Sequence, residues 1–275
     1  MKVTSEFIPN VNFELIPIKN LVSNQEYQRC LSHTHIKRMT ENFDIYQINP
    51  VKISRRDGQN LVMNGQHTIE TIAAISDSRE TPVWCMVYDD LDYIHEAKIF
   101  ASQQEYTKSL SAYEIFNAKI EADSDEQIII KSIVEENGLK IVSTRCSCGL
   151  CAVNTLEEIF RNIGFHGLDR TLKLIVGAWE GENSSLSSNM FNGVALLIST
   201  YGDSLKNDAF IQRVGTVSAR EIARIAKERR NGSLGYAEVI LSIYNKKTKA
   251  GLMLSSIYST EKQMRDNEQG INITA

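Results

Sequence analysis

The feature of this sequence that most constrains its fold is a change of hydrophobic pattern near residue 90. Before it, short apolar runs typical of strands alternate with helical periodicity, and after it nearly every periodic segment is helical. The pattern predicts an α+β protein, with a small mixed-sheet domain followed by an all-helical domain. We place these domains at residues 1–122 and 123–260, with a flexible polar tail at 261–275.

The expected elements follow from apolar spacing and from turn residues. Strands are expected at Phe13–Ile18, Pro50–Ser54, Asn60–Met63, Pro82–Tyr88 and, in the second half, Leu139–Val142. Pro17 predicts that the first of these is an edge strand, and Asp57-Gly58 predicts a tight hairpin between the second and third. Helices are expected at His33–Phe43, from Ile69 onward, and at Tyr93–Gln103, Ser111–Ala122, Asp125–Asn137, Val153–Asn162, Leu168–Glu180, Ser187–Tyr201, Val217–Arg230 and Tyr236–Lys246.

Charge and composition restrict the partners and the compartment. Thirty basic against 34 acidic residues give a net charge of −4, so any contact with a polyanion must come from a local patch. No apolar run approaches the roughly 18–20 residues that span a bilayer, and the first residues do not resemble a secretory signal. Five cysteines, an odd number, do not form a secreted disulfide framework. We therefore expect a cytoplasmic protein without a membrane partner.

The strongest local signal for a site is Asn64-Gly65-Gln66-His67-Thr68, where a strand runs directly into a helix. The free N–H groups and positive dipole end of a helix start can hold a phosphate, and a glycine lets an anion come close to the backbone. The alternative is a plain strand-to-helix turn that needs glycine for its conformation. Spacing alone favours the alternative, under which His67 is a structural histidine.

Two further clusters each have a functional and a structural interpretation. Basic residues concentrate at 213–230, either as a surface for the DNA backbone or as a solvated helix face. The candidate DNA contacts are Arg213, Arg220, Arg224, Lys227 and Arg230. Cys146, Cys148 and Cys151 offer three thiolates to zinc, but four ligands are needed, so reduced thiols without a metal are the favoured interpretation.

Taken together, three segments resemble the ParB N-terminal domain of the ParB/sulfiredoxin superfamily, in the same order and at similar distances. Tyr27-Gln28-Arg29 is similar to its Gln-x-Arg segment, and Asn64–Thr68 is similar to its glycine box. Ser102-Gln103-Gln104, continuing to Glu114, is similar to its Asn-x-Gln-Arg box. The resemblance implies a ParB/sulfiredoxin-like N-terminal domain before a helical domain, as in ParB-like proteins of phages and conjugative elements.

The resemblance also implies a pocket for a nucleoside triphosphate with Mg²⁺. The residues that it implies for nucleotide binding are Arg29, Asn64, Gly65, Gln66, His67, Thr68, Ser102, Gln103, Gln104 and Glu114. Three positions depart from the family pattern, because Thr68 replaces an arginine, Asn64 an aspartate and Ser102 an asparagine. Losing one charge-assisted contact to phosphate costs on the order of 1.5–3 kcal/mol. Sulfiredoxin chemistry is excluded because Gln66 and His67 occupy the place of its cysteine.

These observations favour a nucleotide-pocket protein that regulates plasmid, phage or mobile-element maintenance by binding DNA or a protein partner. An enzyme is the alternative: a Mg²⁺-dependent nucleotide hydrolase or phosphotransferase with His67 as base and Glu70 or Glu114 as metal ligand. The substitutions in the boxes argue against efficient turnover and leave at most a weak NTPase or CTPase. The third hypothesis is a scaffold whose pocket is occluded and binds no nucleotide. The sequence leaves open whether the protein forms a homodimer.

Overall fold

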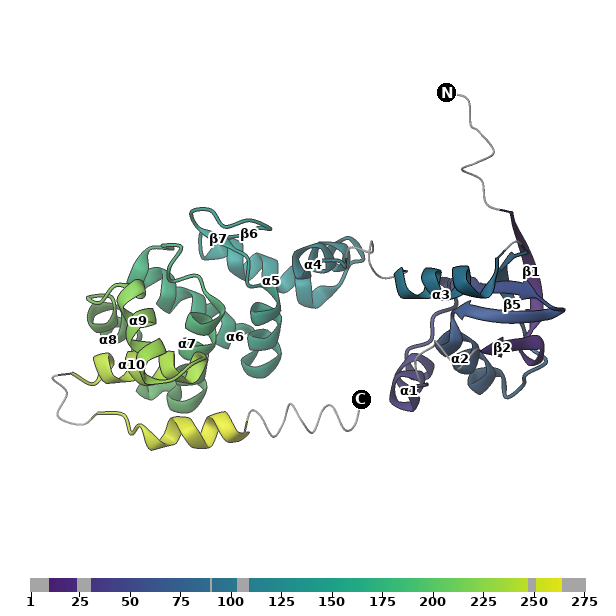
Figure 1. Ribbon diagram of the computed structural model, residues 1–275. Helices are drawn as coiled ribbons and strands as arrows, with labels where there is room; N and C mark the ends of the chain where they lie inside the picture. Colours follow the sequence, from purple (N-terminus) through teal and green to yellow (C-terminus); the bar gives the residue numbers. More distant parts are fainter. Residues whose placement is uncertain (1–9, 24–30, 90, 103–108, 247–250, 264–275) are drawn as a thin grey trace, which may run out of the picture. The chain divides into compact units, whose positions relative to one another are not determined.

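The chain forms two compact units, Met1–Ser109 and Leu110–Ala275, shown in Figure 1. The computed structural model describes residues 10–23, 31–89, 91–102, 109–246 and 251–263. The first unit combines a sheet with helices, and the second is built almost entirely of helices. The predicted α+β class is therefore confirmed.

A five-stranded mixed sheet organises the first unit. Its strands are β1 (Val11–Pro17), β2 (Leu21–Ser23), β3 (Val51–Arg56), β4 (Gln59–Asn64) and β5 (Pro82–Tyr88). They lie in the order β1-β5-β3-β4-β2, so β1 and β2 are the edges. The β1·β5 and β3·β4 pairs are antiparallel, whereas β3·β5 and β2·β4 are parallel. The expected edge position of the first strand is confirmed, and the three-residue β2 was not predicted.

The hairpin between β3 and β4 forms where the sequence predicts it. Asp57 and Gly58 have φ values of 53° and 73°, and two consecutive left-handed residues match the right-handed twist of the flanking strands. Beyond the hairpin, β4 leads directly to Gly65 and then into a helix.

Helices lie on both sides of this sheet. They are α1 (His33–Glu41), α2 (Gln66–Ser76) and α3 (Tyr93–Ser102). Ile69 of α2 packs into a core with Ile53 and Val62. Figure 1 shows α3 on the opposite side of the sheet from α1 and α2. Short 3₁₀ turns occur at Ile18–Asn20 and Ile45–Gln47.

The second unit contains seven labelled helices and a pair of two-residue strands. The helices are α4 (Ala112–Glu121), α5 (Asp125–Glu136), α6 (Val153–Trp179), α7 (Ser188–Tyr201), α8 (Asn207–Val214), α9 (Ala219–Arg229) and α10 (Ser233–Tyr244), and residues 255–263 are also helical. The strands β6 (Lys140–Ile141) and β7 (Gly149–Leu150) are parallel, and a 3₁₀ turn spans Gly202–Ser204. The two helices expected between residues 153 and 180 are the two parts of α6, which Gly164 interrupts with φ 68° and ψ −173°. Neither α8 nor β7 was predicted.

One hydrophobic core joins the helices of the second unit, with Phe116, Phe191 and Phe210 fully buried in it. A polar network links three helices beside this core. Glu157 of α6 accepts hydrogen bonds from Lys119 of α4 at 3.1 Å and from Gln127 of α5 at 2.6 Å. Contacts therefore group α4 with the second unit, whereas the expected boundary at residue 122 assigns it to the first.

Within the described part of the chain, none of the helices combines the length and the apolar character needed to cross a membrane.

Candidate functional site

The start of α2 is the centre of the candidate site. Gly65 occupies its N-cap with φ 105° and ψ 14°, and this position contributes no side-chain hydrogen bond to the first turn. The N–H groups of that turn point away from the helix at its positive end, which favours an anion. A Cβ on Gly65 would lie 3.1 Å from Val51 Cγ2 and 3.3 Å from Val51 Cα. Backbone conformation and packing on β3 therefore both require this glycine, whatever lies outside the turn.

His67 joins the start of α2 to the start of α1. Its Nε2 accepts a hydrogen bond from the backbone N–H of Ser32 at 3.1 Å, and its ring meets that of His35 edge-on with centroids 5.1 Å apart. Ser32 is the N-cap of α1, and its hydroxyl accepts from the N–H of His35 at 3.3 Å. Two helix N-termini and two imidazoles therefore meet at one place. His67 is bonded in this arrangement and is not a free base.

Thr68 faces a different environment from His67. It lines a cavity of about 140 Å³ between α2 and the region where α1 ends. The other lining residues are Met39, Asn42, Phe43, Asp44, Gln47, Ile48, Thr71 and Ile72. The sequence places Thr68 with the phosphate contacts, whereas its position in the structure borders this mixed apolar and polar hollow.

Carboxylates proposed for metal binding or acid–base work already have partners. Glu70 forms a bidentate pair with Arg79 at 3.0 and 3.1 Å. Glu114 lies on α4 of the second unit and completes a capping box with Ser111, accepting its N–H at 2.7 Å. These bonds account for both residues structurally, and the helix expected at Ser111–Ala122 begins at this capping box.

Among the other residues of the expected nucleotide pocket, two lie beside Gly65, one lies elsewhere in the first unit and three lie outside the described residues. Asn64 is exposed at the end of β4 and Gln66 is buried in the first turn of α2, so both flank Gly65. Ser102 ends α3, where its hydroxyl donates to the carbonyl of Lys98 at 2.9 Å. Arg29, Gln103 and Gln104 lie outside the described residues. Of the ten expected residues, a run of five, from Asn64 to Thr68, therefore comes together at one strand-to-helix turn.

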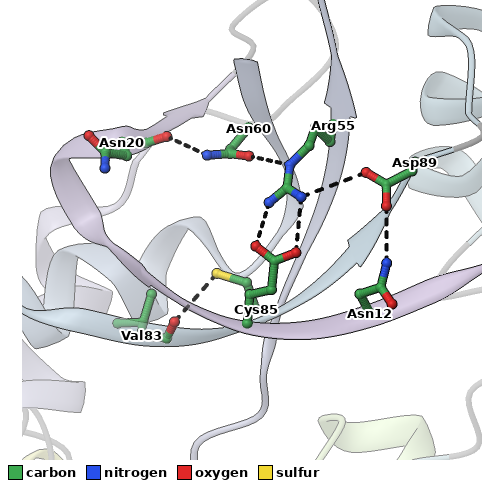
Figure 2. Close-up of polar contacts among 8 residues, drawn as sticks. Asn12, Asn20, Arg55, Asn60, Val83, Cys85 and Asp89 are labelled. Carbon is green, nitrogen blue, oxygen red and sulfur yellow. Dashed lines mark hydrogen bonds and ion pairs between the residues drawn. The ribbon is translucent and has the colours of Figure 1, made fainter. Parts of the chain in front are cut away.

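A second polar cluster in the first unit was not identified from the sequence, and Figure 2 shows its centre, Arg55. The Arg55 guanidinium donates to both carboxylate oxygens of Glu14, at 2.9 and 2.6 Å, and its Nε donates to Asn60 at 3.1 Å. Asp89 lies 3.8 Å away and accepts from Asn12 at 3.2 Å. The cluster thus fastens β1 to β3, β4 and the residue after β5.

Electrostatics in this cluster follow from these contacts. The hydrogen bonds from Arg55 lower the pKa of Glu14, and the bonds to Glu14 raise the pKa of Arg55. Cys85, fully buried on β5, has its pKa raised to about 11 because burial penalises the thiolate. Alternation of side chains along β1 and β3 could have suggested that Glu14 and Arg55 share a face, but only the strand order brings them together.

Most of the candidate DNA contacts at residues 213–230 already have partners within the protein. Arg224 is paired with Glu221 and Glu228, both at 2.6 Å, and these contacts raise its pKa. Arg220 lies 3.6 Å from Glu182, and Arg230 lies 3.7 Å from the buried Glu238. Arg213 donates to the carbonyl of Tyr244 at 2.9 Å and lies over its ring. Lys227 is exposed and lines a shallow hollow along α9 with Arg220 and Arg224.

The cysteine cluster is not arranged as a metal site. Cys146, Cys148 and Cys151 are free thiols, each partly exposed. In the described residues, no group of three histidine, cysteine, aspartate or glutamate side chains could hold a metal ion. Cys148 has φ 54°, and its sulfur lies near Gly181. The three thiols therefore do not gather on one point in this part of the chain.

The fold and site define a class of protein: an α+β unit in which a strand leads through a glycine directly into a helix, followed by a helical unit. The chain belongs to a family of unknown function, DUF6551, whose model matches residues 22–253. None of the curated proteins searched matches it. Among solved structures, it is similar to the C-terminally truncated chromosome-partitioning protein ParB from Caulobacter crescentus, complexed with CTP-γ-S. That similarity has a TM-score of 0.36 and 12% identity, covering 83% of this chain and 98% of the other.

Proposed function

We propose that the first unit binds the phosphate groups of a nucleotide at the start of α2, and that binding regulates a macromolecular partner. The observation that carries the proposal is the convergence of two helix N-termini, joined by the hydrogen bond between His67 and Ser32. Both helices present partial positive charge to the same region, and the effect of helix dipoles is greatest within the first turn. Phosphate is one of the anions that such positions bind in proteins.

Side chains around this point support anion binding over cation binding. His33 and His35 lie in the first turn of α1, and the first turns of both α1 and α2 have no acidic residue. A carboxylate there would compete with a phosphate, and no acidic side chain in either first turn does so.

The contacts of the carboxylates support a binding role more than a hydrolytic one. Mg²⁺ is commonly bound by one or two carboxylates together with the substrate phosphates. Glu70, the closest carboxylate in sequence to the turn, is held by both guanidinium nitrogens of Arg79. His67 uses Nε2 to accept from Ser32, so it could serve as a base only if that bond were broken. We therefore infer that the phosphates themselves would supply most of the ligands for Mg²⁺ and that turnover is slow or absent.

Calorimetric titration of the full chain tests the proposal with tripolyphosphate, CTP, ATP and GTP, each with and without Mg²⁺. Thr68→Glu places a carboxylate in the first turn of α2, and Ile75→Glu places the same group in the last turn as a matched control. We expect Thr68→Glu to weaken binding at least about tenfold, or 1.4 kcal/mol, and Ile75→Glu to leave it nearly unchanged. Equal effects of the two substitutions, or no binding of any of the four ligands, would refute the site.

One observation favours DNA as the macromolecular partner that nucleotide binding regulates. Helices α8 and α9 follow each other across the four residues 215–218, which include Gly215, and α9 exposes Arg220 and Lys227. A short helix–turn–helix with basic residues on its second helix is an arrangement that can approach the DNA backbone. Anisotropy titrations of duplex DNA at several salt concentrations test this idea. The double variant Arg220→Glu/Lys227→Glu should lose affinity and part of the salt dependence, whereas Lys131→Glu on α5 should keep both.

Absence of DNA binding by the wild-type chain at low salt would exclude DNA and leave a protein as the regulated partner. A role in plasmid, phage or mobile-element maintenance is an expectation from the sequence resemblance, and it depends on that result.

A further inference from the structure

The two edges of the five-stranded sheet differ in how they are protected from pairing with another strand. Edge strands expose unpaired backbone groups, and proteins protect them by shortness, charge, proline, bulges or cover. The β2 edge has only three residues, so it offers little backbone to a partner. The β1 edge has seven residues, and among the described strands only β5 pairs with it.

β1 lacks the usual protective features along most of its length. Its pairing with β5 runs without interruption from Val11–Tyr88 to Pro17–Pro82, so it contains no bulge. Pro17 lies at the last position, and the strand has no lysine or arginine. Its single charged residue, Glu14, has both carboxylate oxygens bonded to Arg55.

The side chains beside this edge are also unusually apolar for a solvent-facing surface. Phe13, Leu15 and Trp84 are 55%, 53% and 56% exposed. Leu15 lies directly opposite Trp84 in the β1·β5 register, and Phe13 precedes Leu15 by two positions, so all three occupy one face. A neighbouring strand would cover the outer sides of Phe13 and Leu15.

We propose that β1 pairs with β1 of a second copy of this chain, in antiparallel orientation, and joins two five-stranded sheets across a two-fold axis. A two-fold axis perpendicular to the sheet makes the two identical edge strands run antiparallel. Phe13 and Leu15 lie on one face of β1, and rotation about this axis does not exchange the faces, so these side chains of both copies lie on the same side of the joined sheet. Cross-strand apolar pairs of this kind each contribute roughly 0.2–1 kcal/mol.

Charge favours a second copy over an unrelated strand. Two identical chains have the same net charge of −4, so a surface that pairs with itself must not bring unpaired like charges together. The exposed face of β1 has no charged side chain, and Glu14 on the other face is neutralised by Arg55 of its own chain. Self-pairing therefore brings no unpaired like charges together, and a partner strand chosen by charge would find no complementary group on β1.

Sedimentation equilibrium of the full chain tests the proposal from about 1 to 100 µM, a range that resolves micromolar association. Wild type should approach twice its 31.0 kDa mass at the upper end. Leu15→Lys places a charge on the edge and should raise the dissociation constant about tenfold or more, whereas Val22→Lys, the same change on the exposed Val22 of β2, should not. Phe13→Lys is measured alongside in case Leu15→Lys fails to fold, with circular dichroism reporting the fold of each variant.

Hydrogen exchange gives a second readout that does not depend on any substitution. Amides of residues 11–17 should become more protected as the wild-type concentration rises, and those of residues 21–23 should not change. A wild-type chain that stays monomeric at 100 µM overturns the proposal. A dimer that survives both β1 substitutions, or forms without protection of residues 11–17, also overturns it.

Discussion

Replacing Gly65 by alanine separates the two reasons why the turn before α2 needs glycine. The first is backbone conformation, because φ 105° is a region that side chains rarely adopt. That strain costs about 1–2 kcal/mol. The second is packing, because the new Cβ would lie 3.1 Å from Val51 Cγ2 and 3.3 Å from Val51 Cα. Val51 pairs with Cys85 in the centre of the sheet, so its backbone cannot move freely, and overpacking of this kind costs about 1–3 kcal/mol.

The expected loss for Gly65→Ala is therefore about 2–5 kcal/mol of unfolding free energy. Gly58→Ala is the matched control, since Gly58 has φ 73° but no atom within 4 Å of the added Cβ. Gly58→Ala should therefore lose only the unfolding free energy that comes from backbone strain, about 1–2 kcal/mol. The difference between the two variants isolates the contact with Val51.

Urea unfolding of the full chain, followed by circular dichroism, measures both losses. Hydrogen exchange of residues 51–64 assigns the loss to the first unit, because those amides belong to β3 and β4. If Gly65→Ala is no more destabilised than Gly58→Ala, then Val51 does not limit the turn and the packing explanation of Gly65 is wrong.

Three other predictions follow from contacts described above. Arg55→Gln should reduce the acid sensitivity of the first unit: Arg55 lowers the pKa of Glu14, so their pair stabilises the fold above about pH 4.5 and loses this effect as pH falls through the lowered pKa. Urea midpoints between pH 7 and 3 measure this, and identical pH profiles for variant and wild type would contradict it. Phe191→Ala should destabilise the second unit by about 3–5 kcal/mol, because it removes a fully buried ring. A loss of unfolding free energy under about 1 kcal/mol in urea would show that neighbouring side chains fill the cavity or that Phe191 is not part of the core. Cys85 is buried and has a pKa of about 11, so it should resist a thiol reagent at pH 8 in the folded chain, while Cys146, Cys148 and Cys151 react. Peptide mass spectrometry that finds Cys85 labelled first would refute this expectation.

Features with local causes could be predicted from the sequence. The Asp57-Gly58 hairpin depends on two neighbouring residues, the Ser111–Glu114 capping box on a spacing of three, and the break at Gly164 on one glycine. The strand-to-helix turn at Gly65 is also local, because β4 ends and α2 begins within two residues. Fold class followed from these patterns because hydrophobic periodicity records which side of each element is buried.

Contacts between distant residues were decided only by the tertiary structure. Arg55 and Glu14 are 41 residues apart, and His67 and Ser32 are 35 apart, so each pair depends on strand order or on the packing of α1 against α2. The same reason explains the basic helix, whose charge pattern was visible in the sequence while Glu182 and Glu238 came from other segments. Local sequence determines which elements form, but a group whose partner lies far along the chain acquires that partner only through the tertiary fold, because nothing in its own neighbourhood specifies what will lie against it.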